Sequence, residues 1–119
     1  TAIASNFQAA REFGKAAQYY GELAALTNEA DAYRRQGFAY MSIQRYNDAI
    51  KAFEASLARE SSNAGRVHMS MVDAYLSQGK LREAFASLQQ AKRDSATARQ
   101  ANSYENYIRE KARVKGITL

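Results

Sequence analysis

The sequence predicts an all-α protein built from antiparallel pairs of helices, and three observations support this prediction. Apolar residues recur every three or four positions along most of the 119 residues, which is the spacing of one face of an α-helix. Alanine is abundant, β-branched residues are scarce and proline is absent. An aromatic and alanine pattern also repeats along the chain, at spacings that suit one helix pair per copy.

The first predicted repeat covers residues 1–29. Ala16, between Phe13 and Tyr20, marks its second helix, while Ile3 and Phe7 occupy the matching positions of a first helix that is about one turn short. Residues 27–29 form the predicted connection to the next repeat. A shortened first helix indicates either that the array is cut inside a longer one or that the domain starts with a stunted helix, and an exposed stacking face at Ile3 and Phe7 would favour the first.

The second predicted repeat, residues 30–64, is the clearest copy. Tyr33, Gly37 and Tyr40 lie on one face of its first helix, and Ala49 and Phe53 lie on one face of its second helix. Glycine and alanine let a neighbouring backbone approach closely, while aromatic rings fill the space on either side. We therefore expect these two helices to pack tightly.

The third predicted repeat, residues 65–98, departs from the second at one position. Tyr75, Ala84 and Leu88 occupy the aromatic, small and apolar positions, and Gly79 lies in the predicted turn between the two helices. Val72, however, stands where the second repeat has glycine. The two helices are therefore expected to lie slightly further apart or to be tilted.

A last helix, about residues 99–116, has the features of a cap. Its charged residues cover every face except one apolar stripe, and Arg109 stands where an internal repeat would have an aromatic residue. Such a helix covers the final apolar face and presents charge to water. Gly116 is the predicted end. The stripe contains Ala101, Tyr104, Ile108 and Ala112.

The repeated pattern resembles the tetratricopeptide repeat. The pattern of that family spans about 34 residues and has an aromatic residue, a glycine, a tyrosine, an alanine and a phenylalanine in this order. The second repeat matches it at Tyr33, Gly37, Tyr40, Ala49 and Phe53, although Ser61 replaces the closing proline. Alanines in register across the three copies, at spacings of 33 and 35 residues, are Ala16, Ala49 and Ala84.

The resemblance implies a single domain, residues 1–119, in which helix pairs stack into a right-handed superhelix. Three pairs and the cap give seven helices. Repeats of this family are interaction modules, and the first helices of successive pairs line a concave groove. The implied function is a non-catalytic scaffold that binds a peptide or helix of a partner protein, within a larger bacterial protein or assembly.

The residues that the resemblance places in the groove are both apolar and charged. The apolar ones lie on faces that the core does not need, and methionine adapts to irregular partners. Arg34 and Arg66 flank them and are able to hold a partner's carboxylate bidentately. An alternative is that this surface packs against an upstream repeat. The predicted groove residues are Asp31, Arg34, Phe38 and Met41 from the second repeat, and Arg66, Met69, Asp73 and Leu76 from the third.

Catalytic and metal chemistry is not expected. The chain has no cysteine, which excludes thiolate nucleophiles and cysteine-ligated metals. Its one histidine, His68, occupies the position of Tyr33 and is expected to pack as an aromatic residue. The glycines are scattered, so no phosphate-binding loop is present. We therefore predict no enzyme activity, cofactor or metal.

The charge distribution supports a second functional class. The net charge is +5, and residues 92–119 contribute +4 of it, with seven Lys and Arg against three Asp and Glu. This predicts nucleic-acid or anionic-surface binding through Arg109, Arg113 and Lys115, with Tyr104 and Tyr107 stacking on bases. Nucleic acid is the less favoured partner, because +4 on one helix is a modest field.

Self-association is the third hypothesis, with the short first helix of one molecule stacking on the last helix of another. No apolar run approaches the roughly 18 residues of a membrane span, so we expect a soluble chain without membrane insertion. The segment from Tyr107 to Arg113 resembles the ends of bacterial envelope-associated repeat proteins. This favours the periplasm over the cytoplasm, and the absence of thiols is compatible with it.

Overall fold

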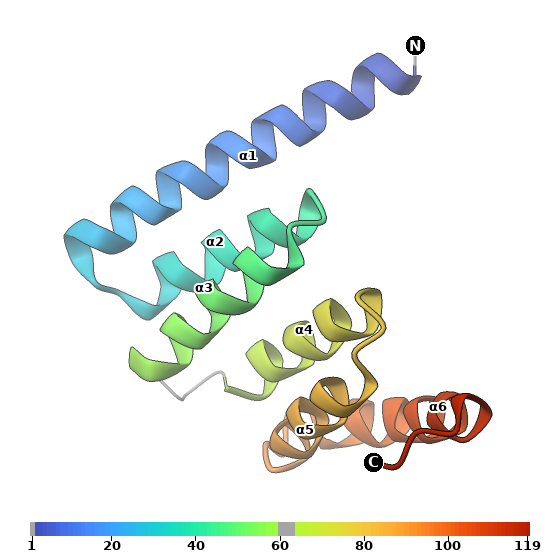
Figure 1. Ribbon diagram of the computed structural model, residues 1–119. Helices are drawn as coiled ribbons and strands as arrows, with labels where there is room; N and C mark the ends of the chain where they lie inside the picture. The colour runs from blue at the N-terminus through green and yellow to red at the C-terminus, as the bar shows by residue number, and fades with distance from the viewer. Residues whose placement is uncertain (1, 60–63) are drawn as a thin grey trace. The chain divides into compact units, whose positions relative to one another are not determined.

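The computed structural model describes the backbone of residues 2–59 and 64–119, and the side chains of residues 11–59 and 64–119. All regular structure in this part of the chain is helical (Figure 1). The helices form two compact units, residues 1–61 and 62–119. The first unit contains α1 (Ala2–Thr27), α2 (Ala30–Ser42) and α3 (Tyr46–Arg59); the second contains α4 (Ala64–Ser77), α5 (Leu81–Lys92) and α6 (Ala98–Lys115).

The prediction of seven helices is wrong, because residues 2–27 form one continuous helix of 26 residues instead of a helix pair. The other turns in the chain use Gln44, with φ of 62°, and Gly79, with φ of 73°. Between Phe7 and Phe13 the sequence is QAARE, which consists of good helix formers. With no glycine or asparagine to adopt a positive φ, the helix continues. The side chains of Ile3 and Phe7 lie outside the described residues.

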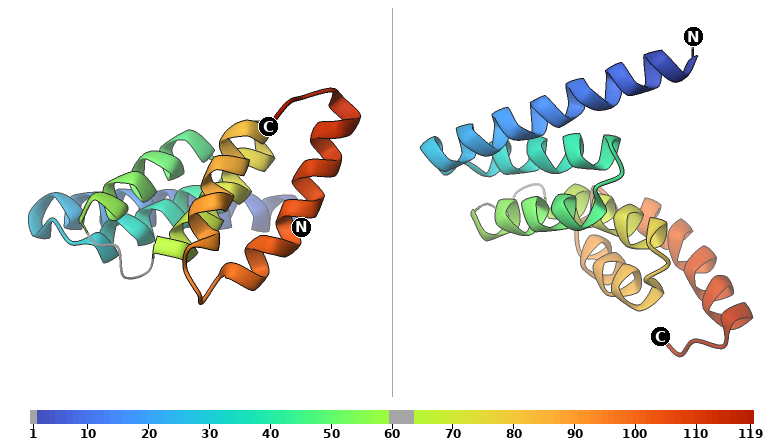
Figure 2. Two further views of the ribbon diagram at one scale, coloured as in Figure 1. Left: turned by 90° about the horizontal axis from the view of Figure 1, so that it is seen from below. Right: turned by 45° about the horizontal axis from the view of Figure 1, so that its top comes forward.

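Helix α1 packs antiparallel to α2 through small residues, and its N-terminal turns extend past the end of α2 (Figures 1 and 2). Ala17 and Ala24 are buried, and Gly21 lies between them on the same face. A Cβ atom on Gly21 would lie 2.5 Å from the side-chain nitrogen of Gln36. Ala16 is half-buried, so the small-residue stripe of α1 lies one residue beyond the predicted register.

Helices α2 and α3 pack as the sequence predicts. Ala49 and Phe53 are fully buried, and a Cβ atom on Gly37 would lie 2.5 Å from the phenylalanine ring. Glycine is therefore required where the ring crosses α2. Close packing of the pair follows from this one contact.

The start of α2 is tied to the end of α3. Asn28 adopts a φ of 55° between α1 and α2, and its side-chain oxygen accepts a hydrogen bond from Arg59. The Arg59 guanidinium also lies 4.3 Å from the centre of the Tyr33 ring. A cation over an aromatic face is a favourable contact. These bonds close the first unit at its connecting loop.

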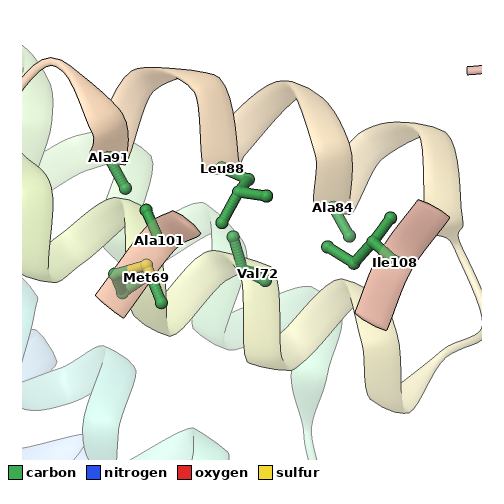
Figure 3. Packing of buried hydrophobic residues seen from close by; sticks show 7 residues of the cluster. All are labelled: Met69, Val72, Ala84, Leu88, Ala91, Ala101 and Ile108. Carbon is green, nitrogen blue, oxygen red and sulfur yellow. The ribbon is translucent and has the colours of Figure 1, made fainter. Parts of the chain in front are cut away.

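The core of the second unit lies between α4, α5 and α6 (Figure 3). In Figure 3, Leu88 of α5 points toward Val72 of α4, and Ile108 of α6 lies beside Ala84. All four side chains are fully buried. Ala84 thus lies at a close helix contact, as its counterpart Ala49 does in the first unit. The buried cluster contains Met69, Val72, Ala84, Leu88, Ala91, Ala101 and Ile108.

In the third repeat, valine replaces the glycine of the second repeat, and the residue that packs on it is leucine instead of the larger phenylalanine. Val72 occupies the position of Gly37, and Leu88 occupies the position of Phe53. A leucine leaves room for the two methyl groups that a phenylalanine ring would displace. The smaller leucine therefore lets α4 and α5 pack without a glycine. The wider spacing expected for these two helices stays a prediction.

The loop between α5 and α6 is held by Asp94. One carboxylate oxygen accepts a hydrogen bond from the amide of Gly65 at 3.1 Å, and the other accepts one from Ala96 at 2.9 Å. Thr97 is buried and donates to the carbonyl of Ala91 at 2.8 Å. The carboxylate therefore caps the N-terminus of α4 from another helix connection. Sequence spacing alone does not show this bond.

Helix α6 covers the last apolar face, as predicted. Ala101, Ile108 and Ala112 are buried toward the core of the unit. Gly116 ends the helix with φ of 71°, and the amide of Ile117 donates to the carbonyl of Ala112 at 2.8 Å. This is the hydrogen bond that a left-handed C-terminal residue allows.

Candidate functional site

A first cleft lies between α1 and α2 and has a volume of about 290 Å³. Aromatic rings from both helices line it, and Arg35 and Ser42 supply its polar groups. The lining residues are Phe13, Ala16, Tyr20, Arg35, Phe38, Ala39 and Ser42.

Phe38, a predicted groove residue, connects this cleft to the core. Its ring packs edge to face on Phe53, with the ring centres 5.3 Å apart. Even so, 44% of Phe38 is exposed. One side of the ring is therefore held by the core while the other is free to contact a partner. Met41, one turn further along α2, is half-buried.

A second, larger cleft lies between α4 and α6 and has a volume of about 410 Å³. Leu76 of α4 forms one wall, and Ser103, Tyr104 and Tyr107 of α6 form the other. Tyr107 is 50% exposed. The lining is mostly apolar, which is the usual character of a binding cleft.

Asp73 lies one turn before Leu76 on α4, is exposed, and has the hydroxyl of Tyr104 close to its carboxyl group. Partial desolvation raises the pKa of this carboxyl above its ordinary value, although the tyrosine hydroxyl acts in the opposite direction. The nearby carboxylate is the main reason that the pKa of Tyr104 is raised. The negative charge is thus poorly compensated at this edge of the cleft.

The charged groove residues of α2 are already paired with each other. Asp31 accepts hydrogen bonds from Arg35, at 2.8 Å, and from Arg34. The bond from Arg35 is the largest cause of the lowered pKa of Asp31, and the bond from Arg34 adds to it. A partner carboxylate would have to displace Asp31 before it could bind these arginines.

Met69 does not line a groove, and its predicted role is corrected here. Only 5% of the residue is exposed, and its side chain lies beside Ala101 in the core of the second unit (Figure 3). The repeat offset placed Met69 on an outer face, but α6 covers that part of α4. Arg66, one turn earlier, is exposed.

The basic residues of α6 are partly neutralised within the helix. Arg109 pairs with Glu105 at 3.2 Å, and Arg113 pairs with Glu110 at 2.5 Å. The guanidinium of Arg109 also lies 5.0 Å from the centre of the Phe85 ring. Two of the three cations predicted to bind phosphate therefore have other partners.

His68 has no arrangement that suggests catalysis. It is half-buried, burial lowers its pKa, and its Nδ1 atom lacks a hydrogen-bond partner among the described residues. No group of three or more potential metal-binding side chains occurs in the described part of the chain.

The cleft residues on α6 were not predicted to line a groove. Tyr104 and Tyr107 were expected to pack or to stack on nucleic-acid bases, and Ser103 carried no signal. They reach the cleft because this face of α6 lies opposite Leu76 of α4. The spacing of Tyr104 and Tyr107, three residues apart on one face of the helix, was the sequence feature that could have indicated this cleft.

Comparison with known proteins identifies one part of the chain. Residues 30–63, a range that contains the whole of α2 and α3, match the family model described as tetratricopeptide repeat. No curated protein matches the chain. Among the described helices, none combines the length and the apolar character that a membrane crossing requires.

Proposed function

From the premise that this is a helical protein of the tetratricopeptide-repeat type, we propose that it is a non-catalytic scaffold that binds a segment of a partner protein on the outer faces of α2 and α4. Protein partners are the usual ligands of such repeats. The partner segment is a peptide or a helix, and the chain acts within a larger bacterial assembly.

One observation carries this proposal most directly: each unit places an apolar side chain of its first paired helix at the edge of its core, where it lines a cleft. Phe38 lies in the α1–α2 cleft, and Leu76 lies in the α4–α6 cleft. Each residue packs on its core with one side, Phe38 against the Phe53 ring and Leu76 against the buried cluster of the second unit, and lines its cleft with another. Exposed apolar residues gathered in a cleft are typical of interaction sites.

The proposed surface consists of the groove residues predicted from the sequence, except for Met69, which is buried. Stacking of the helix pairs into a right-handed superhelix, as the resemblance implies, is part of the proposal. The proposed contact residues are Asp31, Arg34, Phe38, Met41, Arg66, Asp73 and Leu76.

Capture of partners from a cell extract tests the proposal. The immobilised chain is compared with Phe38→Glu and Leu76→Glu, which place a charge in each cleft. Leu26→Glu is the matched control, because Leu26 is 86% exposed and lines neither cleft. We expect the wild type and the control to retain the same proteins, and the two cleft variants to lose them.

Circular dichroism establishes that each variant remains helical. Equal capture by all four proteins, or a loss in Leu26→Glu alone, would contradict a function in these clefts. Loss in only one cleft variant would restrict the site to that unit.

A further inference from the structure

We propose that the α4–α6 cleft recognises a lysine or arginine side chain that lies beside an apolar residue of the partner segment. This inference rests on the proposed function and specifies the chemistry of the partner. It concerns the second unit alone, and it follows from the lining of the cleft and from the state of one carboxylate.

The apolar part of the partner is specified by three side chains. Leu76, Tyr104 and Tyr107 form the walls of a cleft of about 410 Å³, which is within the range of sites that take small ligands. Tyrosine rings offer a flat apolar surface with little conformational freedom to lose on binding. An aliphatic side chain placed between them would remove apolar area from water on both sides.

The charge of the partner is specified by Asp73. Of the eleven side-chain carboxylates that the structure describes, four lie within ion-pair distance of an arginine or lysine, those of Asp31, Asp48, Glu105 and Glu110, and the other seven do not. Asp73 is one of these seven, and it lies one turn before the cleft residue Leu76 and close to the Tyr104 hydroxyl. Since a carboxylate offers about four acceptor positions, several remain for a ligand.

A bound segment would worsen the environment of this carboxylate unless it brought a cation. Asp73 is exposed, but partial desolvation of its carboxyl group already disfavours the charged form. A neutral apolar segment over the cleft would remove more water from it, and an acidic segment would add repulsion. A guanidinium or ammonium group instead supplies charge-assisted hydrogen bonds at the same place. The tyrosine rings add aromatic faces, and Lys111 already lies 5.0 Å from the Tyr107 ring centre.

The second unit carries a net positive charge, and its cation beside the cleft wall is Lys111. Residues 62–119 contain ten Lys and Arg against five Asp and Glu. Charges more than about 8 Å apart are largely screened at physiological ionic strength, whereas a contact pair in a partly buried site is screened much less. The local carboxylate therefore decides which segment is preferred.

Three end-capped peptides test this inference against the full chain. Each has the sequence Gly-Ser-Leu-X-Leu-Ser-Gly, where X is arginine, glutamine or glutamate. Binding is followed by the amide chemical shifts of Leu76, Ser103, Tyr104 and Tyr107. We expect the arginine peptide to bind at least tenfold more tightly than the glutamine peptide, and the glutamate peptide to bind most weakly.

Two variants separate the local carboxylate from the general charge of the unit. Asp73→Asn keeps the shape of the side chain but removes its charge, and should reduce the preference for arginine to less than twofold. Glu83→Gln removes the same charge from an exposed residue of α5 outside the cleft lining, and should keep the preference.

Several results would overturn the inference. These are equal or tighter binding of the glutamine or glutamate peptide, a tenfold preference that survives in Asp73→Asn, shifts that fall outside the cleft, or no binding by any peptide. If partner capture still depends on Leu76 in these cases, the scaffold function stands and only the cationic specificity fails. If capture is independent of both clefts while the arginine peptide binds, the scaffold proposal fails instead.

Discussion

The pairing of a small residue with a large one across two helices has two solutions in this chain. Gly37 lies under Phe53 in the first unit, and Val72 lies under Leu88 in the second. In each pair, the size of the residue on the first helix is matched to the size of the residue that packs on it from the second helix. The sequence predicted the glycine contact correctly, but it did not show that leucine compensates for the valine.

Gly37→Ala should destabilise the chain because the new methyl group would lie within 3 Å of three atoms of the Phe53 ring. Overpacking costs about 1–3 kcal/mol, and the better helix propensity of alanine returns up to about 1 kcal/mol. We expect a net loss of about 1–2 kcal/mol in urea unfolding followed by circular dichroism.

The double variant Gly37→Ala/Phe53→Leu should recover part of this loss, since it approaches the pairing of the second unit. Gly14→Ala is the control, because no atom lies within 4 Å of the new methyl group, and it should be neutral or stabilising. Equal effects at both glycines, with no recovery in the double variant, would exclude the close contact.

Asp73 gives a pH dependence of stability with an unusual sign. Burial raises its pKa in the folded state above the ordinary value of 3.8, so folding favours the protonated form. Its contribution is therefore most favourable below pH 3.8 and is lost as the pH rises through the raised pKa. Asp73→Asn should be at least as stable as the wild type at pH 7. Its free energy of unfolding, measured between pH 3 and 7, should lack the part of the pH dependence that Asp73 causes. A variant that is clearly less stable at pH 7 would contradict burial of an uncompensated charge.

The candidate site was predicted from the sequence only in part, for reasons visible at single residues. Phe38 and Leu76 line clefts because they lie beside the core face of their helices, which the periodicity shows. Met69 was misplaced because its covering helix, α6, departs from the repeat offset. The pairing of Arg34 with Asp31 depends on rotamers, which spacing does not specify.

At the level of whole helices, α6 is attached to α5 by both apolar and charged contacts. Glu105 is 19% exposed at its side chain, pairs with Lys92 at 3.0 Å and also accepts from Arg109. The hydrogen bond from Lys92 is the largest cause of the lowered pKa of Glu105. This network holds the wall of the α4–α6 cleft that carries the two tyrosines.

Glu105→Gln should therefore weaken the attachment of α6. Because the folded pKa is below the ordinary value of 4.5, the stabilisation is present above pH 4.5 and is lost as the pH falls through the folded value. We expect a loss of about 0.5–1 kcal/mol at pH 7, the size of a partly exposed ion pair. Glu110→Gln is the control, since its partner Arg113 lies on the same helix and both are exposed. Equal losses in both variants would show that the link to α5 contributes nothing.

Helix type and most helix ends were predictable, but the length of α1 was not. The turns at Gln44, Gly79 and Gly116 each have positive φ values, and glycine marks two of the three in the sequence. The prediction for residues 1–29 imposed a repeat boundary by offset alone. Local propensity decided the outcome, because nothing in residues 8–12 interrupts a helix.

For the whole molecule, the division into two compact units predicts local effects of core mutations. Ile108 is fully buried in the second unit, and Ile108→Ala should cost about 2–5 kcal/mol through the cavity it leaves. Hydrogen exchange should accelerate mainly in α4, α5 and α6, with smaller changes in α1 to α3. Equal acceleration throughout residues 2–59 and 64–115 would show one cooperative unit instead.

The scaffold proposal depends on where a captured partner contacts the chain. Hydroxyl-radical footprinting of the chain with and without its captured partner measures this directly, side chain by side chain. We predict protection of Phe38, Leu76, Tyr104 and Tyr107, with little change at the exposed residues Lys51 and Glu54 of α3 or Glu83 of α5. Protection confined to those outer positions, with the cleft side chains still reactive, would contradict the proposed function.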